Sequence, residues 1–230
     1  MPYLNRTQII KLIKNKQIYS NKSLNKNQIQ PASIDLTLSH KCYRIKASFI
    51  PNDIKISKII SKLSLSKINL NQNQLLEKNC IYLCELNEKL NLPHDIMGKS
   101  NPKSTTGRLD IFTRVITENG QEYDNVNYNY SGKLYLEIIP QSFSIIIKKN
   151  ISLNQLRFFQ GSNIEDKINQ ISISVSIKRN QLTAYKAKKI TSAINLNKTN
   201  FYLSDKYWEK IIPKDNYFII EKDEFYILRS

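Results

Sequence analysis

The chain has 230 residues, of which 40% are hydrophobic, enough for one large domain or two small ones. No apolar run reaches the ~18 residues of a membrane-spanning helix and no signal-peptide core begins the chain, so we expect a cytoplasmic protein without a membrane partner. The net charge of +16 comes mostly from lysines scattered along the sequence rather than clustered, so we expect no nucleic-acid partner.

The N-terminal part predicts a helix, then a strand, then a surface segment. Residues 5–16 have the apolar spacing of a short amphipathic helix, with Asn5 as the N-cap. Residues 33–38 alternate polar and apolar side chains, which is typical of a strand. Residues 50–73 are rich in Asn, Ser and Lys, and we expect them to run over the surface.

From about residue 74 the pattern becomes β. Short apolar runs separated by turn residues predict strands at 80–86, 109–116, 133–139, 143–148 and 155–159. Short strands with little helix between them favour a sandwich or a barrel over a parallel α/β sheet.

The sequence also contains an internal repeat. Residues 75–83 match 219–227, and weaker echoes link 43–46 with 185–188 and 33–36 with 174–177. We interpret this as two copies of one β domain, the first spanning 1–162 and the second, incomplete, spanning 163–230. The second copy ends before it reaches a counterpart of residues 103–108.

The most unusual segment is residues 101–110 (NPKSTTGRLD), followed downstream by Glu137 inside an apolar strand. An ionised carboxylate is costly in such a strand unless it is paired. One interpretation is a phosphate- and base-binding loop that faces a buried general base. The other is a surface turn followed by an edge strand with one solvated glutamate.

Residues 30–38, 101–115, 132–140 and 153–159 together resemble the dCTP deaminase branch of the trimeric dUTPase superfamily, in its two-domain form. The resemblance implies a mainly β fold: a dUTPase-like distorted β-barrel (β-clip) with a short N-terminal helix, followed by a second, incomplete copy. It also implies hydrolytic deamination of dCTP to dUTP and ammonia without a catalytic metal.

The resemblance also assigns catalytic roles. Glu137 matches the carboxylate that deprotonates the attacking water. Arg108 matches the arginine expected beside that carboxylate, and Ser104 matches the serine that stabilises the water or the developing oxyanion. The zinc route to cytosine deamination needs His-x-Glu with Pro-Cys-x-x-Cys, and the sequence has neither motif.

Substrate-binding roles follow in the same way. Lys103 and Thr105 match residues that bind the triphosphate, and Mg²⁺ would enter on its phosphate oxygens. Backbone groups around Val115 and Thr117 match the segment that reads the base edge. Asn127 stands where relatives often have a carboxylate for the deoxyribose 3′-hydroxyl. The family implies a homo-oligomer, either a trimer or a pseudo-trimeric assembly, with sites between subunits.

Three other interpretations stay open at this stage. A dUTP diphosphatase on the same fold would want an Asp at the phosphate and a Gly-rich C-terminal lid, and Asn127 and the absence of glycine beyond Gly161 argue against it. A truncated, non-catalytic nucleotide-binding protein is the second. The third is a basic nucleic-acid-binding module, which predicts a steep salt dependence of DNA binding.

Overall fold

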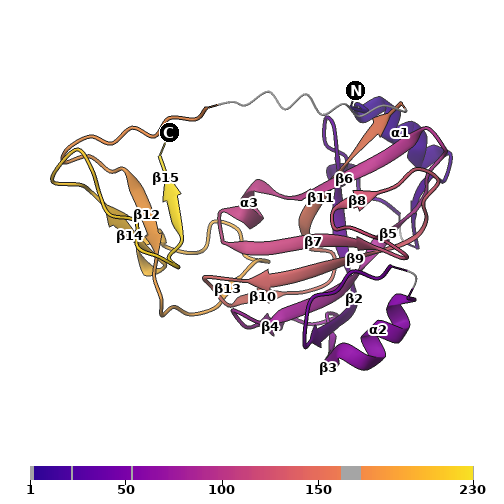
Figure 1. Cartoon of the computed structure of the whole chain (residues 1–230), viewed down its shortest axis with the longest axis horizontal. Coiled ribbons are helices and arrows are strands. Elements are labelled where there is room, and N and C mark those ends of the chain that lie inside the picture. Colours follow the sequence, from indigo (N-terminus) through magenta and orange to yellow (C-terminus); the bar gives the residue numbers. More distant parts are fainter. Residues whose placement is uncertain (1–2, 22, 53, 162–171, 230) are drawn as a thin grey trace.

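The structure is a computed structural model that describes residues 3–21, 23–52, 54–161 and 172–229. Its fold is mainly β, as the sequence predicts, and one nine-stranded sheet curls into a nearly closed barrel (Figure 1). The path of this sheet runs β7 (Ile111–Thr117), β9 (Ser131–Pro140), β5 (Ile81–Asn91), β2 (Ile34–Ile45), β11 (Ser152–Gln160), β6 (Ile96–Pro102) and β8 (Asn125–Val126). Off this path, β1 (Ile18–Ser20) pairs with β5, and β3 (Ser64–Asn69) pairs with β2.

Alternating side chains of these strands fill the interior of the barrel. Leu36 and Leu38 of β2 and Leu134, Leu136 and Ile138 of β9 are among its buried members. Because successive side chains of a strand point to opposite faces, the residues between them point outward. Glu137 therefore lies on the outer face of the barrel wall.

The N-terminal helix α1 (Arg6–Lys14) confirms the predicted helix and its cap. The backbone N–H of Gln8 donates to Oδ1 of Asn5 at 3.1 Å, and the N–H of Asn5 donates to Oε1 of Gln8 at 2.9 Å. This reciprocal capping box satisfies two donors that a helix start leaves without partners. The helix buries Ile9 and Leu12 against the barrel core.

Residues 50–73 run over the surface, as the sequence predicts, because most of the described ones are exposed, but they also form regular elements. They contain α2 (Ile56–Leu63) and β3, and α2 covers part of the outer face of the barrel (Figure 1). The sparse apolar residues of the segment recur at helical spacing, and Ile56 and Ile59 are buried. Ile56 belongs to a second apolar cluster on the outer face, whose other buried members are Ile45, Leu83, Ile116 and Tyr135.

Two further three-stranded sheets complete the chain. In one, β10 (Ile145–Ile147) lies between β13 (Ile194–Asn195) and β4 (Gln74–Leu76). In the other, the C-terminal sheet, β12 (Ala184–Ala187) lies between β14 (Trp208–Ile211) and β15 (Tyr226–Leu228). Phe143 joins this sheet to the barrel by packing against Ala187 and Tyr207. Three short helices, η1 (Lys26–Gln28), α3 (Ser104–Gly107) and η2 (Ser204–Lys206), lie in connections.

The C-terminal sheet repeats the strand pairing of the barrel. In the barrel, β2 and β5 are antiparallel with Tyr43 opposite Leu83. In the C-terminal sheet, β12 and β15 are antiparallel with Tyr185 opposite Ile227, which are the matching residues of the internal repeat. The strands β3 and β14 occupy the same flank of each pair.

One part of the predicted repeat is not seen as a strand, because residues 174–177 have no counterpart of the pairing made by residues 33–36. The predicted boundary between the two copies, at residues 162 and 163, lies outside the described residues. No helix in the described part of the chain is long and apolar enough to cross a membrane.

Candidate active site

Glu137 is fully buried in the middle of β9, on the outer face of the barrel. It lies opposite Leu83 of β5 on one side and Arg114 of β7 on the other. Two donors of Arg114, Nε at 2.9 Å and Nη2 at 2.5 Å, bond to the same carboxylate oxygen, Oε1. The other oxygen, Oε2, is buried and has no hydrogen-bond partner in the described part of the chain. An unsatisfied buried polar atom in a native fold calls for an explanation, and a catalytic role is one.

Two aromatic rings hold the guanidinium of Arg114. Its Cζ lies 3.7 Å from the ring centroid of Tyr123 and 5.0 Å from that of Phe112, both within the range of cation–π attraction. The side chain of Arg114 is 22% exposed, whereas that of Glu137 is 0% exposed. Arg114 therefore lies between the buried carboxylate of Glu137 and the solvent.

Asp124 shares this electrostatic environment. Its Oδ1 accepts from the backbone N–H of Val115 at 2.8 Å, and its own N–H donates to the carbonyl of Val115 at 2.9 Å. Burial raises the pKa of Asp124 to about 6, although the Val115 hydrogen bond and the charge of Arg114 both oppose the rise. The negative charge of Glu137 adds to it, so the two carboxylates and Arg114 form one charged cluster.

The contacts of Asp124 occupy backbone groups of the segment around Val115 and Thr117, which is predicted to read the base edge. The backbone N–H and C=O of Val115 are both engaged by Asp124. The buried Thr117 accepts at its carbonyl from the N–H of Gly120, at 3.2 Å. A base that reads Val115 must share these groups with Asp124, and the base-reading role of both residues stays a prediction.

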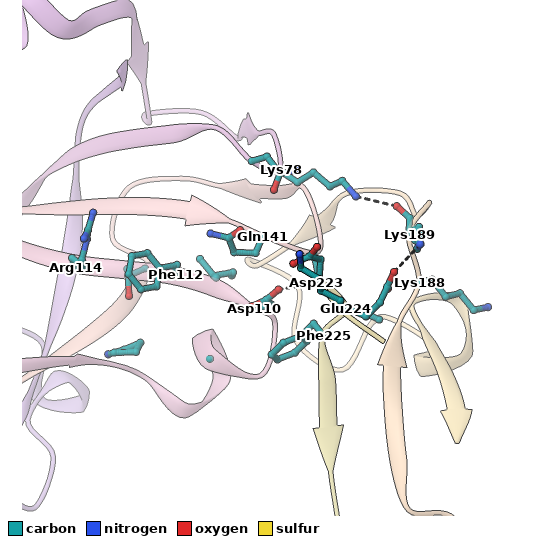
Figure 2. A pocket seen from close by; sticks show the side chains of 18 of the residues that line it. Lys78, Asp110, Phe112, Arg114, Gln141, Lys188, Lys189, Asp223, Glu224 and Phe225 are labelled. Atoms are coloured by element: carbon teal, nitrogen blue, oxygen red, sulfur yellow. Dashed lines mark hydrogen bonds and ion pairs between the residues drawn. The ribbon is translucent and has the colours of Figure 1, made fainter. Parts of the chain in front are cut away.

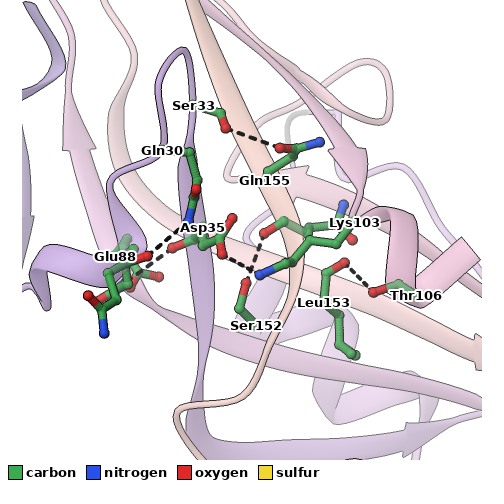
Figure 3. A network of polar contacts seen from close by, with 12 residues as sticks. Gln30, Ser33, Asp35, Glu88, Lys103, Thr106, Ser152, Leu153 and Gln155 are labelled. Atoms are coloured by element: carbon green, nitrogen blue, oxygen red, sulfur yellow. Dashed lines mark hydrogen bonds and ion pairs between the residues drawn. The ribbon is translucent and has the colours of Figure 1, made fainter. Parts of the chain in front are cut away.

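Residues 101–110, the unusual segment of the sequence, form the end of β6, α3 and the connections on either side of α3. Lys103 precedes the helix and forms an ion pair with the largely buried Asp35 of β2 (Figure 3). The hydroxyl of Thr106 donates to the carbonyl of Leu153 at 2.7 Å, which fixes the helix to β11. Thr105 is exposed and lines a cavity of about 540 Å³ shared with residues 194–208.

Two predicted catalytic residues, Ser104 at the start of α3 and Arg108 directly after it, lie together but not beside Glu137. Arg108 donates from Nη1 to the hydroxyl of Ser104, and both side chains are exposed. Among the contacts between described residues, Arg108 makes no hydrogen bond or ion pair with Glu137. Within one chain Arg114 has the position beside Glu137, and the placement of Arg108 beside that carboxylate stays a prediction.

Sequence reasoning missed Arg114, although a signal was present. It is a lone cation in the apolar run 109–116, just as Glu137 is a lone anion in the apolar run 133–139. Opposite charges in two apolar strands are expected to pair if those strands are neighbours.

The predicted sugar-binding residue, Asn127, is exposed in the turn after β8. Its carbonyl accepts from the N–H of Tyr130 at 3.3 Å. Asn129 in the same turn has φ +58°, a left-handed conformation that Asn tolerates better than most residues.

A cleft of about 1210 Å³ separates the barrel from the C-terminal sheet (Figure 2). Phe112 and Arg114 line it on the barrel side, and Asp110 lies at its centre, where burial raises the pKa of that carboxyl. Four lysines line it as well, at positions 78, 188, 189 and 222. In the described part of the chain, no three His, Cys, Asp or Glu side chains are grouped so that they could hold a metal ion.

The chain matches the N-terminal domain of 2′-deoxycytidine 5′-triphosphate deaminase (DCD) over residues 2–162 and the C-terminal domain of the same enzyme over residues 147–230. It belongs to the dCTP deaminase family. The Methanocaldococcus jannaschii protein named "dCTP deaminase, dUMP-forming" is 25% identical over 192 residues, which are 76% of this chain and 88% of that protein.

A solved relative agrees with the fold. The crystal structure of 2′-deoxycytidine 5′-triphosphate deaminase from Agrobacterium tumefaciens is 34% identical and superimposes with a TM-score of 0.92. The match covers 98% of this dCTP deaminase family member and 73% of the Agrobacterium chain.

Proposed function

We propose that the protein hydrolyses dCTP to dUTP and ammonia, with Glu137 as the proton-transfer residue. The observation that carries the proposal is the state of its carboxylate: Oε1 is held by Arg114, while Oε2 is buried and unpartnered. A general base must offer a free, directed oxygen to the water that it deprotonates.

The reaction then needs one carboxylate to move protons in sequence. Glu137 removes a proton from water as the oxygen bonds to C4 of the cytosine ring, and delivers that proton to N3. Glu137 then takes the proton of the C4 hydroxyl and passes it to the exocyclic amine, the C4–N4 bond breaks, ammonia leaves and C4 becomes the uracil carbonyl. The two protons of water therefore end on N3 and on ammonia, which balances dCTP and water against dUTP and ammonia.

Residues of α3 and its two caps supply the remaining roles. Ser104 and Arg108, already bonded to each other, stabilise the attacking oxygen as negative charge develops on it. Lys103 and Thr105 bind the triphosphate, which carries Mg²⁺ on its own oxygens. The ion pair with Asp35 fixes Lys103 at the start of α3 before substrate arrives.

A complete site needs Glu137 and α3 together, and one chain keeps them apart. Because Ser104 and Arg108 are exposed, α3 is free to meet the Glu137 region of another copy. We therefore infer a homo-oligomer, a trimer or a pseudo-trimeric assembly, in which each site takes Glu137 from one chain and α3 from a neighbour.

The name of the Methanocaldococcus relative raises a second candidate, further hydrolysis of dUTP to dUMP. That step needs a group that activates water at the phosphate. Asn127 is an amide where a carboxylate would serve, so dUTP is the expected end product.

One assay tests the function. Purified protein is incubated with dCTP or dUTP and Mg²⁺, and products are resolved by chromatography alongside an ammonia measurement. We expect dUTP and ammonia in equal amounts from dCTP, no conversion of dUTP, and loss of both products in Glu137→Gln. Glu77→Gln changes an exposed glutamate in the connection between β4 and β5, serves as the matched control and should keep full activity. Pyrophosphate and dUMP would support the second candidate, and binding without turnover would leave a nucleotide-binding protein.

A further inference from the structure

We propose that Arg114 is a positioning residue for the deamination, one that fixes Glu137 by a single oxygen so that the other faces the reacting water. The proposal rests on the function proposed above, because it assigns Glu137 the proton transfer. It adds a residue that never touches the substrate and acts through the carboxylate.

The first support is the geometry of the pair. Both Arg114 donors converge on Oε1, rather than taking one oxygen each as a fork-to-fork pair would. The carboxylate is thereby held in one orientation while Oε2 stays free. A purely structural ion pair in a fully buried setting would be expected to satisfy both oxygens.

The second support is that Arg114 is itself held in place. Tyr123 approaches the guanidinium to 3.7 Å and Phe112 to 5.0 Å, and the antiparallel register of β7 and β9 sets Arg114 directly opposite Glu137. A stacked, planar guanidinium loses little freedom when it forms its hydrogen bonds, unlike a flexible lysine. The position therefore requires arginine, not only a positive charge.

The third support is where Arg114 sits between Glu137 and the cleft. Arg114 lines the cleft between the barrel and the C-terminal sheet, whereas Glu137 does not. Removing the arginine side chain would leave a guanidinium-sized space beside Tyr123 that is reachable from solvent. A free guanidinium ion can occupy such a space, and this makes the role testable by chemical rescue.

The experiment measures the steady-state kinetics of dCTP deamination for Arg114→Ala with and without added guanidinium at concentrations that leave the wild type active. We expect kcat to fall by about 10²-fold with KM changed less than about threefold, because orientation of the base is lost while substrate contacts remain. Guanidinium should restore kcat at least about tenfold, while urea, which has a similar shape and no charge, should not. Arg44→Ala, which removes a surface ion pair with Glu77, should keep wild-type kcat and show no rescue.

A kcat for Arg114→Ala within about threefold of wild type, or a loss that guanidinium and urea restore equally, overturns the proposal. If Arg114→Ala does not fold by circular dichroism, the comparison is made with Arg114→Lys, for which wild-type kcat would overturn it. If the wild type deaminates dCTP and Glu137→Gln is inactive, the proposed function holds, and a failed prediction for Arg114 then concerns the role of Arg114 alone. A wild type without deamination overturns both.

Discussion

The barrel and the C-terminal sheet contain the same antiparallel strand pair with different surroundings. In the barrel, the N–H of Glu77 donates to the hydroxyl of Tyr82 at 2.9 Å, and Arg44 pairs with the Glu77 carboxylate at 3.0 Å. In the C-terminal sheet, the matching contacts are made by Glu221, Tyr226 and Lys186, at 3.3 Å and 2.8 Å.

The two regions differ in what pairs with the outer edge of β5 and of β15. In the barrel, β5 pairs further with β9, the strand that carries Glu137. Among the described residues, β15 pairs only with β12. On the function proposed above, the repeated contacts are scaffold and the chemistry lies in parts that occur once among the described residues, namely α3 and the β7–β9 pair.

The largest expected effect is on activity. Ser104→Ala and Arg108→Ala should each lower kcat for dCTP deamination by about 10²–10³-fold, because each removes stabilisation of charge that develops at the attacking oxygen. Glu221→Gln, in the repeated scaffold, should leave kcat unchanged. Steady-state kinetics with the three purified variants measures this. Equal losses from the scaffold variant would remove the distinction between the two regions.

The next effect is on stability and compares two ion pairs. Arg114→Gln leaves the buried Glu137 without its cation and should lower the free energy of unfolding by about 3–5 kcal/mol. Arg44→Gln breaks an exposed pair and should change it by about 1 kcal/mol or less. Urea titration followed by circular dichroism reports both. The double variant Arg114→Gln/Glu137→Gln should recover part of the loss, and a further loss instead would contradict an ion-pair origin.

A smaller effect concerns two glycines near the site. A Cβ at Gly120 would lie 2.4 Å from Oγ1 of Thr117, so Gly120→Ala should lower the free energy of unfolding by about 1–3 kcal/mol. A Cβ at Gly107 of α3 would meet nothing within 4 Å, so Gly107→Ala should raise it by about 0.5–1 kcal/mol. Thermal unfolding of the two variants measures both changes. Equal changes in the free energy of unfolding would contradict the contrast between a tightly packed turn at Gly120 and an open helix surface at Gly107.

The smallest expected effect is the pH dependence that Asp124 contributes. Its folded-state pKa of about 6 lies above the ordinary Asp value, so the folded protein binds this proton more tightly than the unfolded chain. The stabilisation that this proton binding contributes is present below about pH 4 and is lost as pH rises through about 6. Asp124→Asn should remove that loss and make the protein about 1–2 kcal/mol more stable at pH 7 relative to wild type, after solvent screening. Urea titrations at several pH values measure it, and parallel curves for the two proteins would contradict the assignment.

Much of the fold was predictable because its signals are local. The capping box at Asn5 and the spacing of Ile9 and Leu12 define α1. Strand β6 was missed because its central residues include Gly98 and Ser100, which show no alternation, and it forms through pairing with the distant β11. Helix α2 was missed because its few apolar residues are diluted by Lys and Ser.

The site divides in the same way. Glu137 was found because a single carboxylate in an apolar strand is visible in the sequence. Its partner Arg114 depends on the register of β7 against β9, which no local pattern specifies. The relation of Arg108 to Glu137 depends, on our account, on contacts between copies, and a single chain does not contain them.

The most direct test of the account combines two inactive variants in one assembly. Glu137→Gln and Arg108→Ala are co-expressed with different tags, the mixed assembly is isolated through both tags, and ammonia release from dCTP is measured. If each site of a trimer takes Glu137 from one copy and Arg108 from a neighbour, every mixed trimer contains one site with both native residues, and activity should return to about a third of wild type. A mixed assembly as inactive as either parent would contradict the account, because the two residues would then have to come from the same chain.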